Sequence, residues 1–158
     1  MIYTTEQHID DLLRHLGLVR EACCLLGGRL MDRGETDFGR LLIARGHIHD
    51  ASKFHGIEWD YLHVGDSVNE GMLKLAIKQH TTTNSHHPEY HGGIHNMPKL
   101  DIAEMVCDCY ARGQEHGTNI REWFTKSAVQ KYNIDLESKQ WTSIQQYLDL
   151  LLQTGFKK

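Results

Sequence analysis

Residues 47–54 read His-Ile-His-Asp-Ala-Ser-Lys-Phe, and they end a stretch of helical apolar spacing that begins near residue 36. His49 and Asp50 are neighbours in this stretch, and the side chains of neighbouring residues on a helix point about 100° apart. Both can therefore reach one metal ion only if the ion lies near a helix end or between packed helices. The remaining ligands would then come from other helices. This short stretch predicts several helices packed around a His-Asp pair.

Helical spacing of apolar residues extends over most of the chain. Thr4 and Gln7 fit a capping box, and the first helix is expected to run to about Leu26, where Gly27 and Gly28 would end it. Residues 29–37 would form a connection. Further helical patterns cover residues 36–48, 58–63, 68–80, 100–111, 120–132 and 141–151. With no alternating β-branched run, repeat or linker, the sequence predicts one all-α domain over residues 1–158, a compact bundle of about six to seven helices.

Residues 81–98 read TTTNSHHPEYHGGIHNMP and have no apolar periodicity. Their proline, asparagine and Gly-Gly punctuation predicts a loop. A loop of this length inside a compact domain is usually functional or disordered. The chain has twelve histidines, and nine of them lie between residues 47 and 95, several in this loop. This concentration favours a functional loop.

The formal net charge of −4 gives no general attraction for duplex DNA or an anionic membrane, so neither is an expected partner. An anionic substrate would have to be attracted locally. The four cysteines form an adjacent pair and a C-x-C, which are not the spacings of zinc ribbons or thioredoxin-like sites. A signal-peptide pattern and a membrane-spanning apolar run are both absent from the sequence. A reduced, cytoplasmic protein is expected, and a homo-oligomer is left open.

Side chains on two further helices could complete a site. Asp101, Glu104 and Asp108 fall at i, i+3 and i+7, on one stripe of a helix. The apolar context around Asp108 suggests a carboxylate close to the core, which must be paired, hydrogen-bonded or bound to metal. On the first helix, His8 and His15 are seven residues apart and share a face, so either can point at the same ion. A buried ion-pair network is the structural alternative to a metal site.

The ordered set H…HD…D in an all-helical chain resembles the HD superfamily of metal-dependent phosphohydrolases. HDASKF, residues 49–54, is similar to the HD-x-x-K form of its motif, and HLGLV, which starts at His15, is similar to the opening H-x-x-x-V. His15 lies 34 residues before His49, a spacing that suits the family better than the 41 residues from His8. VCDCYA, around Asp108, resembles the closing motif.

The middle segment resembles one branch of this superfamily. HHPEYHGGI, residues 86–94, is similar to the HHE-x-x-x-G stretch of HD-GYP proteins, with His80 as an additional upstream histidine. The GYP tripeptide is absent, so cyclic di-GMP is not implied as the substrate. HD-x-SK-F, N-x-HHPE-Y, GI-x-x-M and EM-x-CD together resemble a family of small bacterial and phage proteins, over residues 5–112.

The resemblance implies a metal site residue by residue. Four side chains would bind a first ion: His15, His49, Asp50 and Asp108. His80 and either His86 or His87 would bind a second ion or a phosphate. The expected cofactor is a divalent ion (Mn, Fe, Co, Mg, Ni or Zn), with one or two bound per chain.

The resemblance also implies contacts with a substrate. Lys53 would lie beside the scissile phosphate, with Asn84 and His87 as further substrate-binding residues. The nucleotidase branch carries a glutamate three positions after the motif aspartate, and this chain does not. The general acid is therefore open among three residues: Glu58, Glu89 and Glu104.

These features predict an HD-type phosphohydrolase that cleaves a phosphate ester or anhydride of a nucleotide or similar small molecule through a metal-bound hydroxide. Lys53 and the metal would neutralise charge on the phosphate oxygens. Two alternatives stay open. HD-like folds also include mixed-valence di-iron oxygenases, in which the extra histidines would hold a second iron. A non-catalytic module would bind a nucleotide without releasing phosphate.

Overall fold

The computed structural model describes residues 4–62 and 69–154. The long elements are α1 (Thr5–Asp32), α2 (Thr36–Ile48), α4 (Glu70–Thr83), α5 (Lys99–His116) and α8 (Lys139–Leu152). The shorter ones are α3 (Gly56–Tyr61) and a continuous segment of α6 (Ile120–Trp123), a π-helical turn (Phe124–Ala128) and α7 (Val129–Lys131). Within the described ranges there is no strand, which confirms the predicted all-α bundle. The predicted boundaries at residues 63 and 68, and residues 1–3 and 155–158 of the predicted domain, lie outside the described residues.

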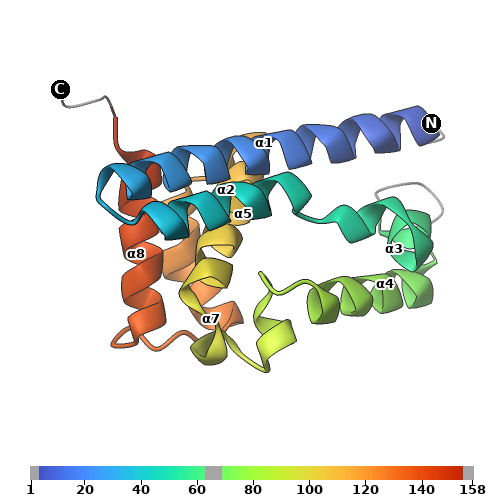
Figure 1. The fold of residues 1–158 in the computed structure, drawn as a ribbon. Helices are drawn as coiled ribbons and strands as arrows, with labels where there is room; N and C mark the ends of the chain where they lie inside the picture. The colour runs from blue at the N-terminus through green and yellow to red at the C-terminus, as the bar shows by residue number, and fades with distance from the viewer. Residues whose placement is uncertain (1–3, 63–68, 155–158) are drawn as a thin grey trace.

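α1 and α2 form an antiparallel pair, and α5 packs against both (Figure 1). α8 packs on α5 and α1 at one end of the molecule, whereas α3 and α4 contact each other at the opposite end. The C-terminal end of α2 and the segment after α4 lie between these two ends. Among the described helices, none combines the length and the apolarity needed to cross a membrane.

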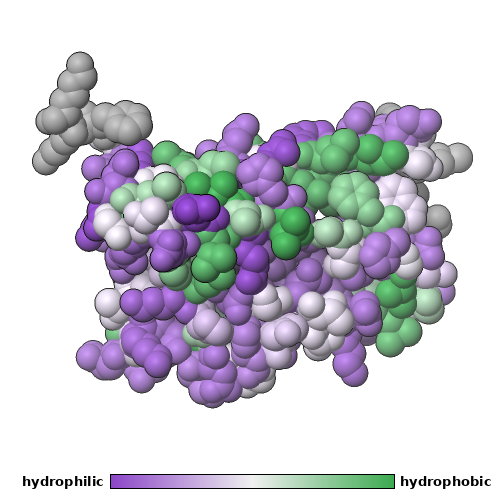
Figure 2. All heavy atoms as spheres, in the orientation of Figure 1, coloured by the Kyte–Doolittle hydropathy of each residue, from purple (hydrophilic) through white to green (hydrophobic). Residues whose placement is uncertain are grey.

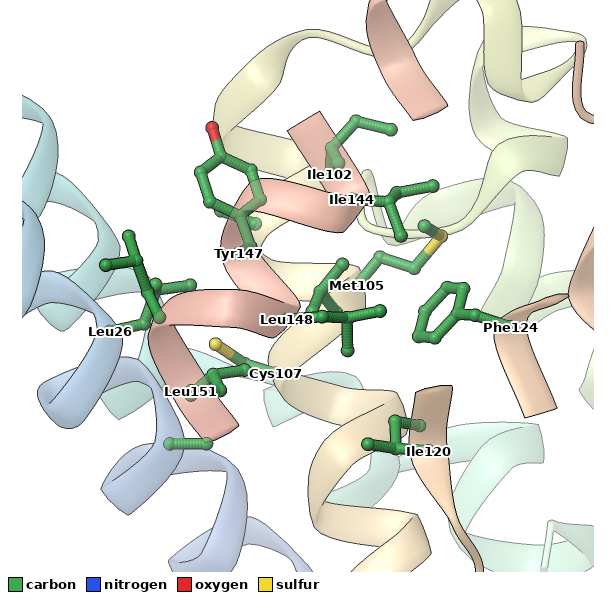
Figure 3. Close-up of a cluster of buried hydrophobic side chains, with 14 of the residues drawn as sticks. Leu26, Ile102, Met105, Cys107, Ile120, Phe124, Ile144, Tyr147, Leu148 and Leu151 are labelled. Atoms are coloured by element: carbon green, nitrogen blue, oxygen red, sulfur yellow. The ribbon is translucent and has the colours of Figure 1, made fainter. Parts of the chain in front are cut away.

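The apolar core lies between the second half of α1, α5, α8 and the segment from α6 to α7 (Figure 3). Leu26, Ile102, Phe124 and Leu148 are fully buried there. Removing such side chains from water stabilises the fold by roughly 25 cal/mol per Å² of apolar surface. This packing fixes α5 against α1 and so sets which polar side chains of the two helices can meet.

α1 does not end at Gly27 and Gly28 as predicted but continues to Asp32. A Cβ atom on Gly27 would lie 2.7 Å from the carbonyl oxygen of Gly39 and 2.7 Å from Cγ1 of Ile43. Glycine here therefore allows α1 and α2 to pack closely. Tertiary packing outweighs the low helix propensity of glycine, which costs about 1 kcal/mol relative to alanine.

The segment at residues 81–98 is more regular than the predicted loop. α4 extends to Thr83, and two 3₁₀ helices occupy Pro88–His91 and Ile94–Asn96. Gly92 and Gly93 have φ angles of 71° and 141°, which favour glycine and reverse the chain between the two short helices. Ile94 is buried in the core, so this part of the segment is held by packing.

Apolar side chains also lie on the outer face of the α1–α2 pair (Figure 2). Leu13, Leu41 and Ile48 are each more than half exposed, at 53%, 56% and 67%. Single exposed apolar residues are normal on protein surfaces. A homo-oligomer therefore stays a prediction.

Candidate metal centre

The His-Asp pair lies in a sharp turn at the C-terminal end of α2. α2 ends at Ile48, His49 is extended, and Asp50 has a left-handed backbone with φ 55°. This backbone conformation is uncommon for a residue other than glycine. Both residues are buried, with 4% of His49 and 2% of Asp50 exposed. The end of the helix thus lets two adjacent side chains reach the same interior region.

Four predicted ligands converge at this turn, and we call them the first group: His15, His49, Asp50 and Asp108. Nε2 of His15 lies 2.9 Å from Oδ1 of Asp108, and Nε2 of His49 lies 3.3 Å from Oδ2 of Asp50. The ligand atoms of His15, His49 and Asp50 all lie within 4.8 Å of one another. These groups, from α1, the end of α2 and α5, can hold a metal ion.

A second group shares Asp50 with the first: Asp50, His80, His86 and His87. Their ligand atoms also lie within 4.8 Å of one another. Oδ1 of Asp50 is 3.3 Å from Nε2 of both His80 and His86, whereas Oδ2 lies beside His49. The two oxygens therefore face different histidines, as a carboxylate that bridges two ions would. The sequence left open whether His86 or His87 would join His80 as a ligand, and the structure brings both into this group.

Several polar atoms at the centre are buried without a hydrogen-bond partner. They are Nε2 of His49, His86 and His87 and Oδ1 of Asp50, whereas Oδ2 of Asp50 is ion-paired with Nζ of Lys53. An unpaired buried polar group costs roughly 1–3 kcal/mol, and a charged one costs more. A cation bound among these atoms would satisfy all of them together. They fit a metal centre better than a closed ion-pair network.

The other ring nitrogen meets a carboxylate in four clustered histidines: His15, His49, His80 and His86. Nδ1 of His15 is 2.9 Å from Oε2 of Glu115, and Nδ1 of His80 is 2.5 Å from Oε1 of Glu58. Such carboxylates fix the orientation of metal-binding histidines and leave Nε2 as the ligand atom. Glu58, a candidate general acid from the sequence, is buried in this outer position. The sequence analysis did not identify Glu115. The one sequence feature that could have indicated it is its position seven residues after Asp108, on the same face of α5.

Glu104, another candidate general acid, links the two groups. Its Oε1 lies 2.8 Å from Nδ1 of His49 and 3.3 Å from Nδ1 of His86. Nε of Arg45 donates to its other oxygen at 2.7 Å, and Arg45 also pairs with Asp101. Burial alone would raise the pKa of Glu104, but hydrogen bonds from His49 and His86 lower it to about 2. The ionised carboxylate therefore accepts hydrogen bonds from histidines of both groups.

The two adjacent histidines of the second group differ in protonation. Burial, His86 and His80 lower the pKa of His87 to about 3, so its ring is neutral and ready to bind a metal. Burial also disfavours the charged form of His86, but the neighbouring carboxylates of Asp50 and Glu104, each 3.3 Å from its ring nitrogens, raise its pKa to about 9. An ion bound here would displace a proton from His86 and none from His87.

A family model described as "Family of unknown function (DUF5662)" matches residues 4–150. The chain belongs to this family. The matched range includes both groups of ligands and the carboxylates behind them. No curated protein and no solved structure matches the chain. For this DUF5662 protein, the likeness to HD phosphohydrolases therefore rests on its sequence motifs.

Two predicted substrate-binding residues of the DUF5662 chain lie beside the second group. Nζ of Lys53 is 2.9 Å from Oδ2 of Asp50. The amide nitrogen of Asn84 donates to Oγ of Ser52 at 3.1 Å and to the carbonyl oxygen of His80 at 3.0 Å. These bonds tie the end of α4 to the turn after α2. Lys53 therefore lies at the ligand groups themselves, whereas Asn84 supports the wall of the site; their contacts with a substrate stay a prediction.

Two other candidates lie outside both groups. Glu89 is exposed, and it is not among the clustered ligands. The ring of His8 stacks on Trp59, with the ring centres 4.2 Å apart. Of the two histidines that share a face of α1, the structure brings His15 to the other ligands.

A cleft of about 630 Å³ opens over the two groups of candidate ligands. His15, His80 and Asp108 contribute to its lining. Arg14, Lys53 and Arg112 line it as well, and they supply basic groups. Asp11, Asp108 and Glu115 line the cleft too, and each basic group lies beside a carboxylate: Arg14 beside Asp11, Lys53 beside Asp50 and Arg112 beside Glu115. The charges of the cleft are therefore balanced, and attraction for an anionic ligand would come from cations bound below it.

Proposed function

We propose that this protein is a metal-dependent hydrolase of the HD type that cleaves phosphate esters or anhydrides of small molecules such as nucleotides. One observation carries the proposal: the ligand atoms of buried histidines and carboxylates converge around Asp50 beneath a cleft that Lys53 and Arg112 also line. Clustered imidazole and carboxylate ligands fit a cation, and a bound cation together with Lys53 would fit an anion. A metal ion beside an anionic substrate is the combination that phosphate hydrolysis uses.

The donor set fits two divalent ions. The first group would hold one ion and the second group the other, with Asp50 between them. Imidazole and carboxylate ligands together suit Mn, Fe, Co, Ni and Zn, whereas Mg prefers oxygen ligands and keeps several waters. A first-row transition ion is therefore favoured over Mg.

When bound, such ions lower the pKa of a coordinated water toward 7 and place positive charge beside the phosphate oxygens. Lys53 lines the cleft beside Asp50. Its ammonium group would hold a phosphate oxygen and neutralise charge that develops during cleavage. Arg112 on α5 supplies a second cation to the same cleft.

The glutamates first considered as general acids have other roles in this proposal. Glu58 and Glu104 would position histidines, since their oxygens already accept hydrogen bonds from imidazole nitrogens. None of the three candidates, Glu89 included, is among the described residues that line the cleft. His8 and His116 line the cleft outside both ligand groups, which places them better to donate a proton to a leaving group.

A phosphate-release screen tests the proposal. Protein loaded with Mn, Fe, Co, Ni or Zn would be assayed against nucleotides and sugar phosphates, beside Asp50→Ala and the exposed control Asp149→Ala. Wild type and control should turn over, and Asp50→Ala should lose activity by about 10³-fold because both groups lose a ligand. Equal activity in wild type and Asp50→Ala would contradict the proposal. Nucleotide binding without phosphate release, under every metal, would favour a non-catalytic module instead.

A second candidate is a mixed-valence di-iron oxygenase. It is favoured by the two oxygens of Asp50, which face different histidines as a carboxylate between two irons would. The iron content and absorption spectrum of anaerobically purified protein separate the two candidates. A phosphohydrolase releases phosphate without oxygen, whereas an oxygenase consumes oxygen and requires both irons.

A further inference from the structure

A second cavity, of about 200 Å³, lies beside the cleft along α5. Asp108, Arg112 and His116 line both the cavity and the cleft. They are spaced four residues apart, so they form a ridge along one face of the helix. We call the smaller space the ridge cavity. A molecule that lies across the ridge can place one part over the metal centre and another part in this cavity.

The far wall of the ridge cavity includes two aromatic residues, Trp123 and Tyr132. In the described part of the chain, neither the indole nitrogen nor the phenol hydroxyl has a hydrogen-bond partner. Burial raises the pKa of the Tyr132 hydroxyl, so it is protonated and can donate at neutral pH. Lys131 lines the cavity as well, with Nζ 5.1 Å from the centre of the Tyr132 ring. The wall therefore offers flat apolar surfaces and hydrogen-bond donors.

The π-helical turn at Phe124–Ala128 shapes this wall. In a regular helix, Trp123 and Tyr132 would lie nine positions and about 180° apart around the axis. The extra residue of a π turn reduces this angle to about 80°, which lets both rings face one cavity. π turns are rare in proteins as a whole, but those that occur are often at functional sites. The irregularity of the helix is thus a second feature that points to this cavity.

The size and chemistry of the ridge cavity restrict its ligand. An apolar cavity of about 150 Å³ can hold benzene. The ridge cavity, at about 200 Å³, is therefore large enough for a planar ring system. Aromatic walls pack well against such rings. Because the wall supplies donors, the ring should carry acceptors such as ring nitrogens or carbonyl oxygens.

We propose that the ridge cavity is the subsite for the organic group of the substrate, a heteroaromatic ring with hydrogen-bond acceptors. This inference rests on the proposed function, in which the phosphate lies in the cleft beside Lys53. Arg112, on the ridge, stands between the two spaces and can contact the phosphate from the ring side. The substrate class is then a phosphate ester that carries such a ring, and not a simple sugar or polyol phosphate.

A matched pair of substrates tests the subsite. Adenosine 5′-monophosphate and ribose 5-phosphate share a sugar phosphate and differ by the ring. The kcat/KM of metal-loaded wild type should be at least about tenfold higher for the first. Tyr132→Phe should reduce this preference about threefold to tenfold, and Trp123→Ala should abolish it. Tyr110→Phe, the same change at a residue of α5 that does not line the ridge cavity, should leave the preference unchanged.

Binding of adenosine, which has no phosphate, gives a measurement independent of turnover. Calorimetric titration should show binding that competes with adenosine 5′-monophosphate and weakens in Trp123→Ala at unchanged metal content. If no ester is hydrolysed but adenosine binds in this way, the proposed function fails and the ring site stands. If esters are hydrolysed with equal preference by wild type, Trp123→Ala and Tyr132→Phe, the subsite is overturned and the function stands. Adenosine that binds without competition also overturns the subsite.

Discussion

The apolar core and the candidate metal centre bury their side chains equally well, but with opposite energetic consequences. Leu26 and Leu148 in the core have no exposed surface, and His86 at the centre has 2%. Burial in the core stabilises the fold because apolar surface leaves water. Burial at the centre removes polar and charged groups from water, which costs free energy unless they find partners. The core therefore depends on packing alone, whereas the centre depends on what binds there.

The protein itself supplies part of what the centre needs. The outer carboxylates satisfy Nδ1 of His15, His49 and His80, and Arg45 in turn pairs with Glu104. Nε2 of His49, Nε2 of His86 and Oδ1 of Asp50 have no hydrogen-bond partner. A bound cation is therefore the component that would complete the polar region. Removing the cation should affect the candidate metal centre, whereas truncating an apolar side chain should affect the core.

Metal removal is expected to give the largest effect. Each ion present at 100 times its Kd adds about 2.7 kcal/mol to the free energy of unfolding, so two ions add about 5 kcal/mol. Urea unfolding with and without a chelator measures this difference. Asp50→Ala should not respond to the chelator. Equal stability of the wild type under both conditions would show that no ion supports the centre.

Leu148→Ala is the matched control in the core. Leu148 packs among apolar residues of the core. Its truncation should lower the free energy of unfolding by about 2–5 kcal/mol, by the same amount with and without the chelator. A loss that depends on the chelator would mean that the two regions are energetically coupled.

Two of the outer carboxylates, Glu104 and Glu115, should differ in how many metal ions they affect. Glu104 contacts histidines of both groups, whereas Glu115 contacts His15 of the first group and also pairs with Arg112. Glu104→Gln should weaken the binding of both ions about 10–100-fold, and Glu115→Gln should weaken only one. Calorimetric metal titration resolves the two steps, with the exposed Glu122→Gln as control. If Glu104→Gln affected a single step, the shared role of this carboxylate would be wrong.

Two adjacent glycines give the smallest effects and test packing alone. An added Cβ on Gly27 meets Gly39 and Ile43, whereas one on Gly28 meets nothing within 4 Å. Gly27→Ala should therefore lower the free energy of unfolding by about 1–3 kcal/mol. Gly28→Ala should raise it by about 0.5–1 kcal/mol, because alanine favours the helix. Urea unfolding measures both, and a change of the same sign in both variants would contradict the close packing of α1 and α2.

Local patterns predicted the helices and the residue types of the centre, but not the partners of each side chain. The adjacency of His49 and Asp50 predicted a site near a helix end or between packed helices, and the structure places the pair at the end of α2. The sequence marked Glu58 and Glu104 as nearby acids, and only the structure shows that they hold histidine nitrogens. A glutamate that donates a proton and a glutamate that orients a histidine look alike in a sequence. The two roles differ in what the side chain contacts, which only the folded structure shows.

By itself, the sequence determined an all-helical chain and a set of histidines and acids suited to a metal. Only the tertiary structure decided that α1 continues past Gly27, that His86 and His87 both join the second group, and that a separate cavity lies beyond the α5 ridge. The physical reason is the range of the interactions involved. Helical hydrogen bonds join residues four apart. His15 and Asp108 are 93 residues apart and meet only when α1 and α5 pack.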